Sequence, residues 1–214
     1  MLPEESATRR ACRHDVTMVR IVSGIAGGRR LAVPPHGTRP TSQRVREAVF
    51  STLQARRGGG LAGARVLDLY AGSGAFGLEA LSRGAAHVRF VESDRRTAAV
   101  LRRNIAALGL AGREEGTAEV LTADVLTVLR GQRGQPSQPS QPYDVVFADP
   151  PYALADAALT KLLQALVGGH WLGPDGVIVL ERPAKAAPPV WPQGVRPLTD
   201  RRYGDTAVYY GCAP

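Results

Sequence analysis

Short apolar runs alternate with helix-like segments along the chain from residue 65 onward. Apolar runs bounded by turn residues predict strands, and apolar residues spaced three or four positions apart predict helices. The expected strands are Arg65–Tyr70, Val88–Val91, Glu119–Thr122, Tyr143–Ala148 and Gly176–Leu180. The expected helices are Ala75–Arg83, Asp94–Leu108 with Ser93 as its cap, one from Asp124, and Leu154–Val167. This alternation predicts a mostly parallel sheet with helices on both faces.

The pattern changes near the C-terminus. Val195–Thr199 and Thr206–Tyr210 have strand patterns with no helix between them. Such a pair predicts an antiparallel hairpin at the edge of the sheet. Together with the five strands above, this predicts an α/β fold of the Rossmann-like type with seven strands.

The first 60 residues are organised differently. Two β-type runs predict a small hairpin around Gly24–Gly28. Apolar residues at helical spacing then predict a helix that Thr41 or Ser42 caps and that Gly58–Gly60 end. The expected domains are a disordered extension (1–17), a basic hairpin and helix (18–60), and a main domain (61–214) with a flexible Gln/Pro/Ser-rich insertion (131–142).

Basic residues outnumber acidic ones by 27 to 19, which gives a net charge of +8. Between Arg20 and Arg57 there are eight arginines and one acidic residue, Glu47, so this stretch alone carries +7. Guanidinium groups bind phosphates in a planar, two-pronged geometry. A nucleic acid is therefore the favoured partner, and a solvated basic face without a partner is the alternative.

Several classes of protein do not fit the composition. No apolar run approaches the ~20 residues that a membrane helix needs, and the first residues lack the apolar core of a secretory signal. Cys12 and Cys212 stand far apart and predict neither a disulfide framework nor a zinc site. We expect a cytoplasmic monomer with reduced thiols, no metal and no membrane partner.

The segment Gly72–Gly77 fits the pattern G-x-G-x-x-G between a strand and a helix, and Glu92 follows at the spacing of a dinucleotide site. Asp68 argues against a pyrophosphate, because a carboxylate beside the loop would repel it. A cofactor with a cationic amine and a sulfonium, S-adenosylmethionine, reverses that argument. Glu92 would accept hydrogen bonds from its ribose, and Asp124 would bind the adenine amine, cap a helix, or do both.

The turn Asp149-Pro150-Pro151-Tyr152 directly follows the fourth strand of the main domain, where open α/β sheets bind ligands. The prolines restrict the backbone and remove two N–H donors. The Asp149 carboxylate and the Pro150 carbonyl would accept both hydrogens of an exocyclic amine, which aims its lone pair at a methyl group. Tyr152 would stack on the base, worth ~1–3 kcal/mol. A strand-ending proline turn is the plain alternative.

Other functions stay open at this point. Adenine N6 of DNA and a protein glutamine amide are also amines of this kind, although no separate DNA-recognition domain is visible and the arginines fit a protein substrate poorly. A non-catalytic RNA-binding module is opposed by the intact Asp68, Glu92 and Asp149. A nicotinamide oxidoreductase leaves the D-P-P-Y turn without a role.

The motifs together resemble the class I S-adenosylmethionine-dependent methyltransferases. They are most similar to the RsmD family, bacterial enzymes that methylate the N2 amine of a guanine in small-subunit ribosomal RNA. The matching segments are RIVSGIAGGRRLAVPPHGTRPTSQRVREAVFSTL (20–53), VLDLYAGSGAFGLEALSRGA (66–85), VESD (91–94), DPPY (149–152) and RYGDT (202–206). The N-terminal TRPTSQRVRE stretch is the specific element, since the other motifs occur across methyltransferases.

The resemblance implies S-adenosylmethionine as cofactor, 16S ribosomal RNA or an assembling small ribosomal subunit as partner, and direct methyl transfer without a metal. It implies cofactor contacts at Asp68, Tyr70, Gly72, Ser73, Gly74, Glu92, Ser93, Asp124, Thr41 and Arg44. It implies amine activation at Asp149, Pro150, Pro151 and Tyr152, and RNA contacts at Arg29, Arg30, Arg39, Arg46 and Tyr203. The N-terminal members of these sets would close over the cofactor or hold RNA.

Overall fold

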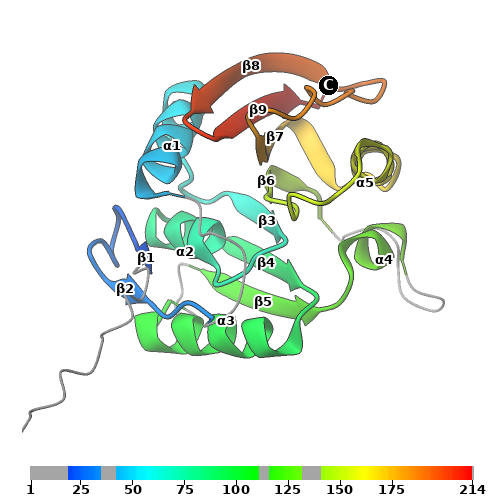
Figure 1. Ribbon diagram of the computed structural model, residues 1–214. Coiled ribbons are helices and arrows are strands. Elements are labelled where there is room, and N and C mark those ends of the chain that lie inside the picture. Colours follow the sequence, from blue (N-terminus) through cyan, green and yellow to red (C-terminus); the bar gives the residue numbers. More distant parts are fainter. Residues whose placement is uncertain (1–18, 35–41, 111–115, 132–140, 214) are drawn as a thin grey trace, which may run out of the picture.

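Strands and helices alternate through most of the chain in the computed structural model, which describes residues 19–34, 42–110, 116–131 and 141–213 (Figure 1). The strands are β1 (Val19–Arg20), β2 (Arg30–Leu31), β3 (Arg65–Leu69), β4 (His87–Glu92), β5 (Thr117–Thr122), β6 (Tyr143–Ala148), β7 (Leu172–Pro183), β8 (Arg196–Tyr203) and β9 (Thr206–Cys212). The helices are α1 (Gln43–Arg57), α2 (Ala75–Ser82), α3 (Arg95–Leu108), α4 (Val125–Arg130) and α5 (Asp156–Gly168).

Seven strands form one sheet in the order β5-β4-β3-β6-β7-β9-β8. The first five of these run parallel, β9 is antiparallel to β7, and β8 is antiparallel to β9. The predicted Rossmann-like sheet with an antiparallel hairpin at its edge is therefore confirmed. The last parallel strand, β7, begins at Leu172 rather than Gly176 because Leu172 already pairs with Tyr143.

All five parallel strands end at one edge of the sheet, which we call the carboxyl edge. β3 and β6 are neighbours, and Leu69 pairs with Ala148 at their ends. The segments that follow these two strands are the glycine loop and the D-P-P-Y turn. The parallel register therefore brings together two motifs that lie about eighty residues apart in the chain.

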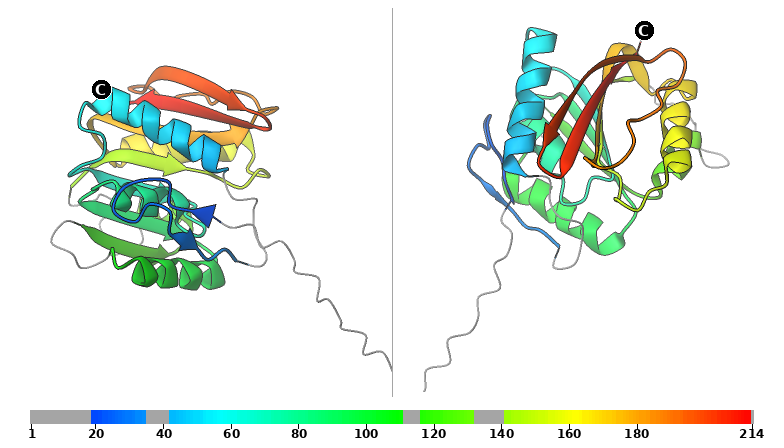
Figure 2. Two further views of the ribbon diagram at one scale, coloured as in Figure 1. Left: turned by 90° about the vertical axis from the view of Figure 1, so that its left-hand side faces the viewer. Right: turned by 45° about the horizontal axis from the view of Figure 1, so that its top comes forward.

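The two faces of the sheet are covered by different helices. α1, α2 and α3 lie on one face and α4 and α5 on the other (Figures 1 and 2). Successive strand residues point to opposite faces, so Val66 joins the core under α1–α3 while Leu67 joins the core under α4 and α5. No described helix is both long and apolar enough to cross a membrane.

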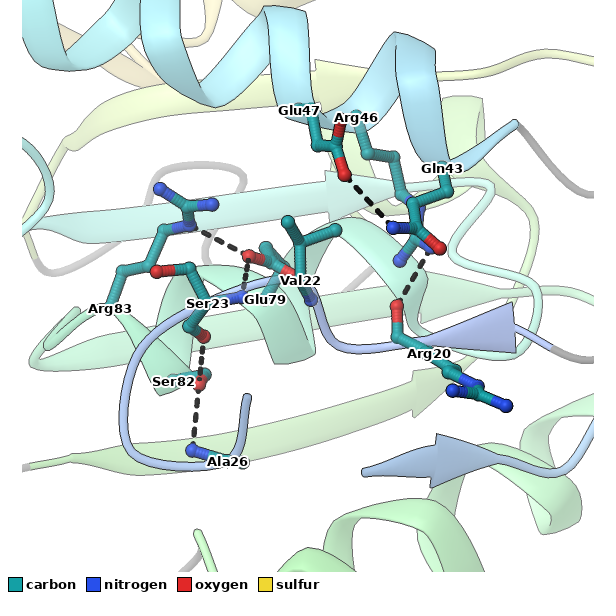
Figure 3. A network of polar contacts seen from close by, with 10 residues as sticks. All are labelled: Arg20, Val22, Ser23, Ala26, Gln43, Arg46, Glu47, Glu79, Ser82 and Arg83. Carbon is teal, nitrogen blue, oxygen red and sulfur yellow. Dashed lines mark hydrogen bonds and ion pairs between the residues drawn. The ribbon is translucent and has the colours of Figure 1, made fainter. Parts of the chain in front are cut away.

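The β1–β2 hairpin docks on α2 through a buried carboxylate. Glu79 of α2 is fully buried and accepts hydrogen bonds from the backbone N–H groups of Val22, at 2.5 Å, and Ser23, at 3.0 Å (Figure 3). Ser82, one turn later, accepts from the N–H of Ala26 at 2.9 Å and donates to the Ser23 carbonyl at 2.5 Å. The hairpin loop is thus fixed by polar contacts on one face of α2.

Some expected boundaries change. Asp94, not Ser93, caps α3, since its carboxylate accepts from the Thr97 N–H at 2.7 Å. Ser42 caps α1. α5 begins at Asp156 rather than Leu154, because the Leu154 N–H closes a turn onto the Pro151 carbonyl. The predicted extension 1–17 and most of the insertion 131–142 lie outside the described residues.

Candidate active site at the carboxyl edge

The loop between β3 and α2 follows a path that glycine adopts most easily. Gly72 and Gly74 have φ values of 56° and 87°, in the left-handed region. A Cβ on Gly74 would overlap Leu101 of α3, and a Cβ on Gly77 would overlap Phe90 of β4. The three glycines therefore serve both the turn and the close approach of α2 to the sheet, as the G-x-G-x-x-G pattern predicts.

Glu92, at the end of β4, holds this loop through hydrogen bonds. One of its oxygens accepts from the Gly72 N–H at 2.9 Å and the other from the Asp94 N–H at 2.8 Å. The structure thus places Glu92 beside the glycine loop, and its contact with a ribose stays a prediction. Each carboxylate oxygen has a second lone pair, so these bonds leave Glu92 able to accept from a ribose hydroxyl.

Asp68 lies beneath the loop and is 3% exposed. Its carboxylate accepts a hydrogen bond from the Gly77 N–H at 2.9 Å. Burial raises the pKa of Asp68 well above its usual range, and the nearby charges of Asp149 and Glu92 raise it further, against the opposing effect of the Gly77 bond. Three carboxylates thus gather at one place, where a cation would relieve their mutual repulsion.

Tyr70, directly after β3, and Asp124, after β5, lie close enough to interact. Tyr70 has a φ of 58°, unusual for a residue with a side chain. Burial, together with the charge of Asp124, raises the pKa of Tyr70 to about 12. Asp124 accepts from the Thr127 N–H at 2.9 Å and so caps α4. Its predicted role as a helix cap is confirmed, and its contact with an adenine amine stays a prediction.

The D-P-P-Y turn leaves β6 at the same edge. Asp149 is half-buried, Pro150 is buried and Pro151 is exposed. The charge of Asp149 raises the pKa of Asp68, which places the turn close to the glycine loop. Tyr152 is 53% exposed, an unusual value for an aromatic side chain. A half-buried acceptor and an exposed aromatic ring thus lie three residues apart in the sequence at the carboxyl edge of the sheet.

The turn between β8 and β9 reaches the carboxyl edge as well. Thr206 pairs with Pro183, the last residue of β7, and the Ala184 N–H donates to the Asp205 carbonyl at 2.8 Å. Tyr203 is half-buried and packs against the core under α1–α3. The β8–β9 hairpin therefore lies beside β7, the neighbour of β6, and the D-P-P-Y turn follows β6. The hairpin extends the site on that side of the sheet.

Comparisons with known proteins agree with this geometry. The family model described as conserved hypothetical protein 95 matches residues 19–211. The ribosomal RNA small subunit methyltransferase D of Haemophilus influenzae is 35% identical over 87% of this chain and 89% of its own length. The enzyme of the same name from Escherichia coli strain K12 is 35% identical over 81% of this chain and 79% of its own length.

This chain belongs to the RsmD family. Solved structures give the same result. A candidate methyltransferase of Escherichia coli, yhhF, superposes with a TM-score of 0.76 at 31% identity, covering 92% of this chain and 98% of that one. A hypothetical protein of Thermus thermophilus superposes with a TM-score of 0.71 at 33% identity, covering 90% of this chain and 98% of that one.

Two arginines of this RsmD-family chain, one buried and one exposed, form hydrogen bonds within the fold. Arg46 is only 1% exposed and donates to the Arg20 carbonyl at 2.8 Å (Figure 3). Burial lowers the pKa of Arg46, against the opposing effect of the nearby Glu79 charge. The expectation that Arg46 presents its guanidinium to RNA is therefore wrong.

Arg29 is used within the fold. Its guanidinium donates to the carbonyls of Leu108, at 3.0 Å, and Ala107, at the C-terminal end of α3. These carbonyls have no partner inside the helix, and a cation there also suits the helix dipole. Arg30 and Arg44 are exposed, and their contacts with RNA and with the cofactor stay predictions. Arg39 and Thr41 lie outside the described residues.

The sequence reasoning missed Asn104. It lies on α3, is 4% exposed, and bonds the backbone of both Ala32 and Ser73. A hint was present in the sequence: Asn104 stands in line with Leu101 and Leu108, so the apolar stripe of α3 includes a polar residue. A buried amide needs partners, and here it finds them in the hairpin and in the glycine loop.

Proposed function

We propose that this protein transfers a methyl group from S-adenosylmethionine to the exocyclic N2 amine of a guanine in 16S ribosomal RNA. The observation that carries the proposal is the meeting of the glycine loop and the D-P-P-Y turn at one edge of the sheet. The names of the curated relatives support a ribosomal RNA substrate. The resemblance to the RsmD family supports the choice of guanine N2.

The residues at the carboxyl edge fit the proposed cofactor, which supplies an electrophilic methyl group when bound. Backbone groups of Gly72 and Gly74 would lie along the cofactor, and Glu92 would accept from the ribose hydroxyls. Asp124 would accept from the adenine amine. Asp68, Glu92 and Asp149 form an acidic cluster, which favours an amine and a sulfonium and opposes a diphosphate.

The D-P-P-Y turn fits the proposed acceptor. The Asp149 carboxylate and the Pro150 carbonyl would accept the two hydrogens of the guanine amine and so orient its lone pair toward the methyl group. Tyr152, with its exposed ring, would stack on the base. Positioning of this kind can contribute ~7–11 kcal/mol in favourable cases, and Asp149 is a suitable acceptor for the proton that the amine loses.

The arrangement of arginines supports an RNA partner at the same edge. α1 and α3 both begin there, since α1 leads by a short loop to the start of β3 and α3 follows the end of β4. Arg44 of α1 and Arg95 and Arg96 of α3 are exposed, and none forms an ion pair with another described residue. Toward the opposite edge, Arg57 pairs with Asp144.

A methyl-transfer assay tests the proposal. Tritiated S-adenosylmethionine is offered with deproteinised 16S ribosomal RNA, assembled small subunits and duplex DNA in parallel reactions, and the products are digested and identified as nucleosides by mass. We expect N2-methylguanosine from one or both RNA substrates. Methylated adenine from DNA, or no transfer to any substrate while the protein binds adenosylhomocysteine, would overturn the guanine assignment.

A further inference from the structure

Asn104 joins the hairpin, which is expected to contact RNA, to the glycine loop, which is proposed to hold the cofactor. Its Oδ1 accepts from the Ala32 N–H at 2.9 Å, and its Nδ2 donates to the Ala32 carbonyl at 3.0 Å and to the Ser73 carbonyl at 2.9 Å. Ala32 directly follows β2, and Ser73 lies in the glycine loop. One buried carboxamide therefore holds the end of the basic hairpin and the cofactor loop at once.

The hydrogen bond from Asn104 to Ser73 falls in the middle of the glycine loop. Ser73 stands between Gly72 and Gly74, the two left-handed glycines. The peptide group is planar, so a carbonyl held in one direction also fixes the next N–H, that of Gly74. Leu101, one turn earlier on α3, lies against Gly74. Helix α3 thus holds the loop by packing and by a hydrogen bond from Asn104.

The anchors of the hairpin on α2 do not bond to this loop. Glu79 and Ser82 bind Val22, Ser23 and Ala26, on the side of the hairpin that faces α2. They fix the hairpin to the fold without reaching the glycine residues. The contrast allows the docking of the hairpin to be separated from its connection to the cofactor site.

We propose that Asn104 is a positioning residue that couples the cofactor site to the hairpin, so that filling the glycine loop orders the hairpin for RNA. The inference rests on the proposed function, in which the loop holds S-adenosylmethionine, and on the expected contact of the hairpin, with its exposed Arg30, with RNA. Asn104 keeps all three bonds only when the loop and the hairpin are both in place. Ligand binding that orders the loop therefore also favours the ordered hairpin, and the effect is reciprocal.

Hydrogen exchange of the hairpin amides, with and without adenosylhomocysteine, tests this coupling without any RNA. The variants are N104D, which keeps the acceptor for Ala32 but turns a carboxylate toward two carbonyls, and N104A, which removes all three bonds. The matched control is S82A, which loosens the hairpin at Ser82 and leaves the glycine loop untouched. Calorimetry gives the affinity of each protein for adenosylhomocysteine, and thermal melting shows that each is folded.

In the wild type, adenosylhomocysteine is expected to slow exchange of the amides of Ile21 and Gly28, which bond within the hairpin. In N104A and N104D this protection is lost and the ligand binds about five- to tenfold more weakly, the effect of losing one buried hydrogen bond. S82A is expected to exchange faster without ligand, yet to keep the protection and an affinity within about twofold of wild type.

The outcomes separate the two proposals. A wild type that binds adenosylhomocysteine without any slowing of hairpin exchange overturns the coupling and leaves the proposed function intact. Protection that persists in both Asn104 variants also overturns it. A wild type that binds no adenosylhomocysteine overturns the proposed function itself. If N104D does not fold, N104A and the wild type still decide the question.

Discussion

Asp149 is the residue on which the proposed chemistry depends most directly. The change D149A removes the carboxylate that would accept from the amine, and Pro150, its neighbour, keeps its carbonyl. We expect the rate of methyl transfer to fall by about 10²–10⁴-fold, the usual contribution of one positioned acid–base group. The affinity for adenosylhomocysteine should change little, because this ligand lacks the sulfonium charge and the glycine loop and Glu92 are intact.

Single-turnover transfer to 16S ribosomal RNA and calorimetry with adenosylhomocysteine measure these two quantities in D149A. E119A serves as the control, since it also removes a carboxylate, one that is 41% exposed on β5 and outside the D-P-P-Y turn. Turnover in D149A within about threefold of the rate of this control variant would show that Asp149 does not activate the amine.

Asp68 is expected to make cofactor binding depend on pH. Burial raises the pKa of Asp68 in the free protein, and a bound cation lowers it again. The ionised form therefore binds the cation better, and affinity for S-adenosylmethionine rises with pH above the ordinary range of an aspartate. Release of one proton limits this rise to at most about tenfold per pH unit, and calorimetry at a series of pH values measures it.

The variant D68N is the control for this pH dependence. Asparagine keeps an oxygen to accept from the Gly77 N–H but carries no charge. We expect weaker binding with a flat pH profile and a melting temperature at least equal to that of the wild type, since no charge is buried. The same rise with pH in D68N would assign the titration to another group.

At the scale of elements, the docking of the hairpin depends on the buried Glu79. The change E79A leaves the N–H groups of Val22 and Ser23 without an acceptor and removes the partner of Arg83, which Glu79 binds at 2.7 Å. Removing one member of a buried charged network costs about 3–5 kcal/mol. We expect a loss of this size in the free energy of unfolding, measured by urea denaturation.

Glu119 on β5 provides an exposed control for E79A. Glu119 pairs with Arg89 at 2.7 Å, but its side chain is 41% exposed. An ion pair of this kind contributes about 0–1 kcal/mol, so E119A should unfold close to the wild type. Equal losses in E79A and E119A would show that burial does not decide the strength of the Glu79 contacts.

At the scale of the whole molecule, positive charge is distributed unequally over the two faces. α1 and α3 contain eight arginines and one acidic residue, whereas α4 and α5 contain Arg130, Lys161 and Asp156. α3 carries Arg95 and Arg96 in its first turn, where the helix dipole disfavours cations. The placement does not serve the stability of the helix, and it suits a phosphate backbone lying across the α1–α3 face.

The double variant R95E/R96E tests this distribution. We expect weaker RNA binding. The slope of the logarithm of the binding constant against the logarithm of the salt concentration should become shallower by about 1.4, which is about 0.7 for each of two phosphates of a single strand. The helix itself should gain stability, because acidic residues suit a helix N-terminus. The double variant R130E/K161E makes the same charge change on the other face. Equal effects of the two variants on a binding titration at several salt concentrations would exclude a specific RNA face.

The sequence by itself determined the class of fold and the chemistry of the motifs. Strand length, apolar periodicity and turn residues are local properties, so β6 was predicted at its observed bounds and the seven strands were all found. The pairing of a glycine loop with a D-P-P-Y turn indicated one site because parallel strands end at a common edge. The need for glycine at positions 72, 74 and 77 could also be predicted, since the tight turn and the close packing of helix on sheet both exclude a side chain.

Only the tertiary structure decided which charged and polar groups are free. Arg44 and Arg46 stand two residues apart, yet Arg44 is exposed whereas Arg46 is buried and donates to the Arg20 carbonyl of the hairpin. Whether Asn104 has partners depends on where a hairpin about seventy residues away comes to rest. Burial and hydrogen bonding of this kind arise from contacts between distant segments, and a local pattern does not contain them.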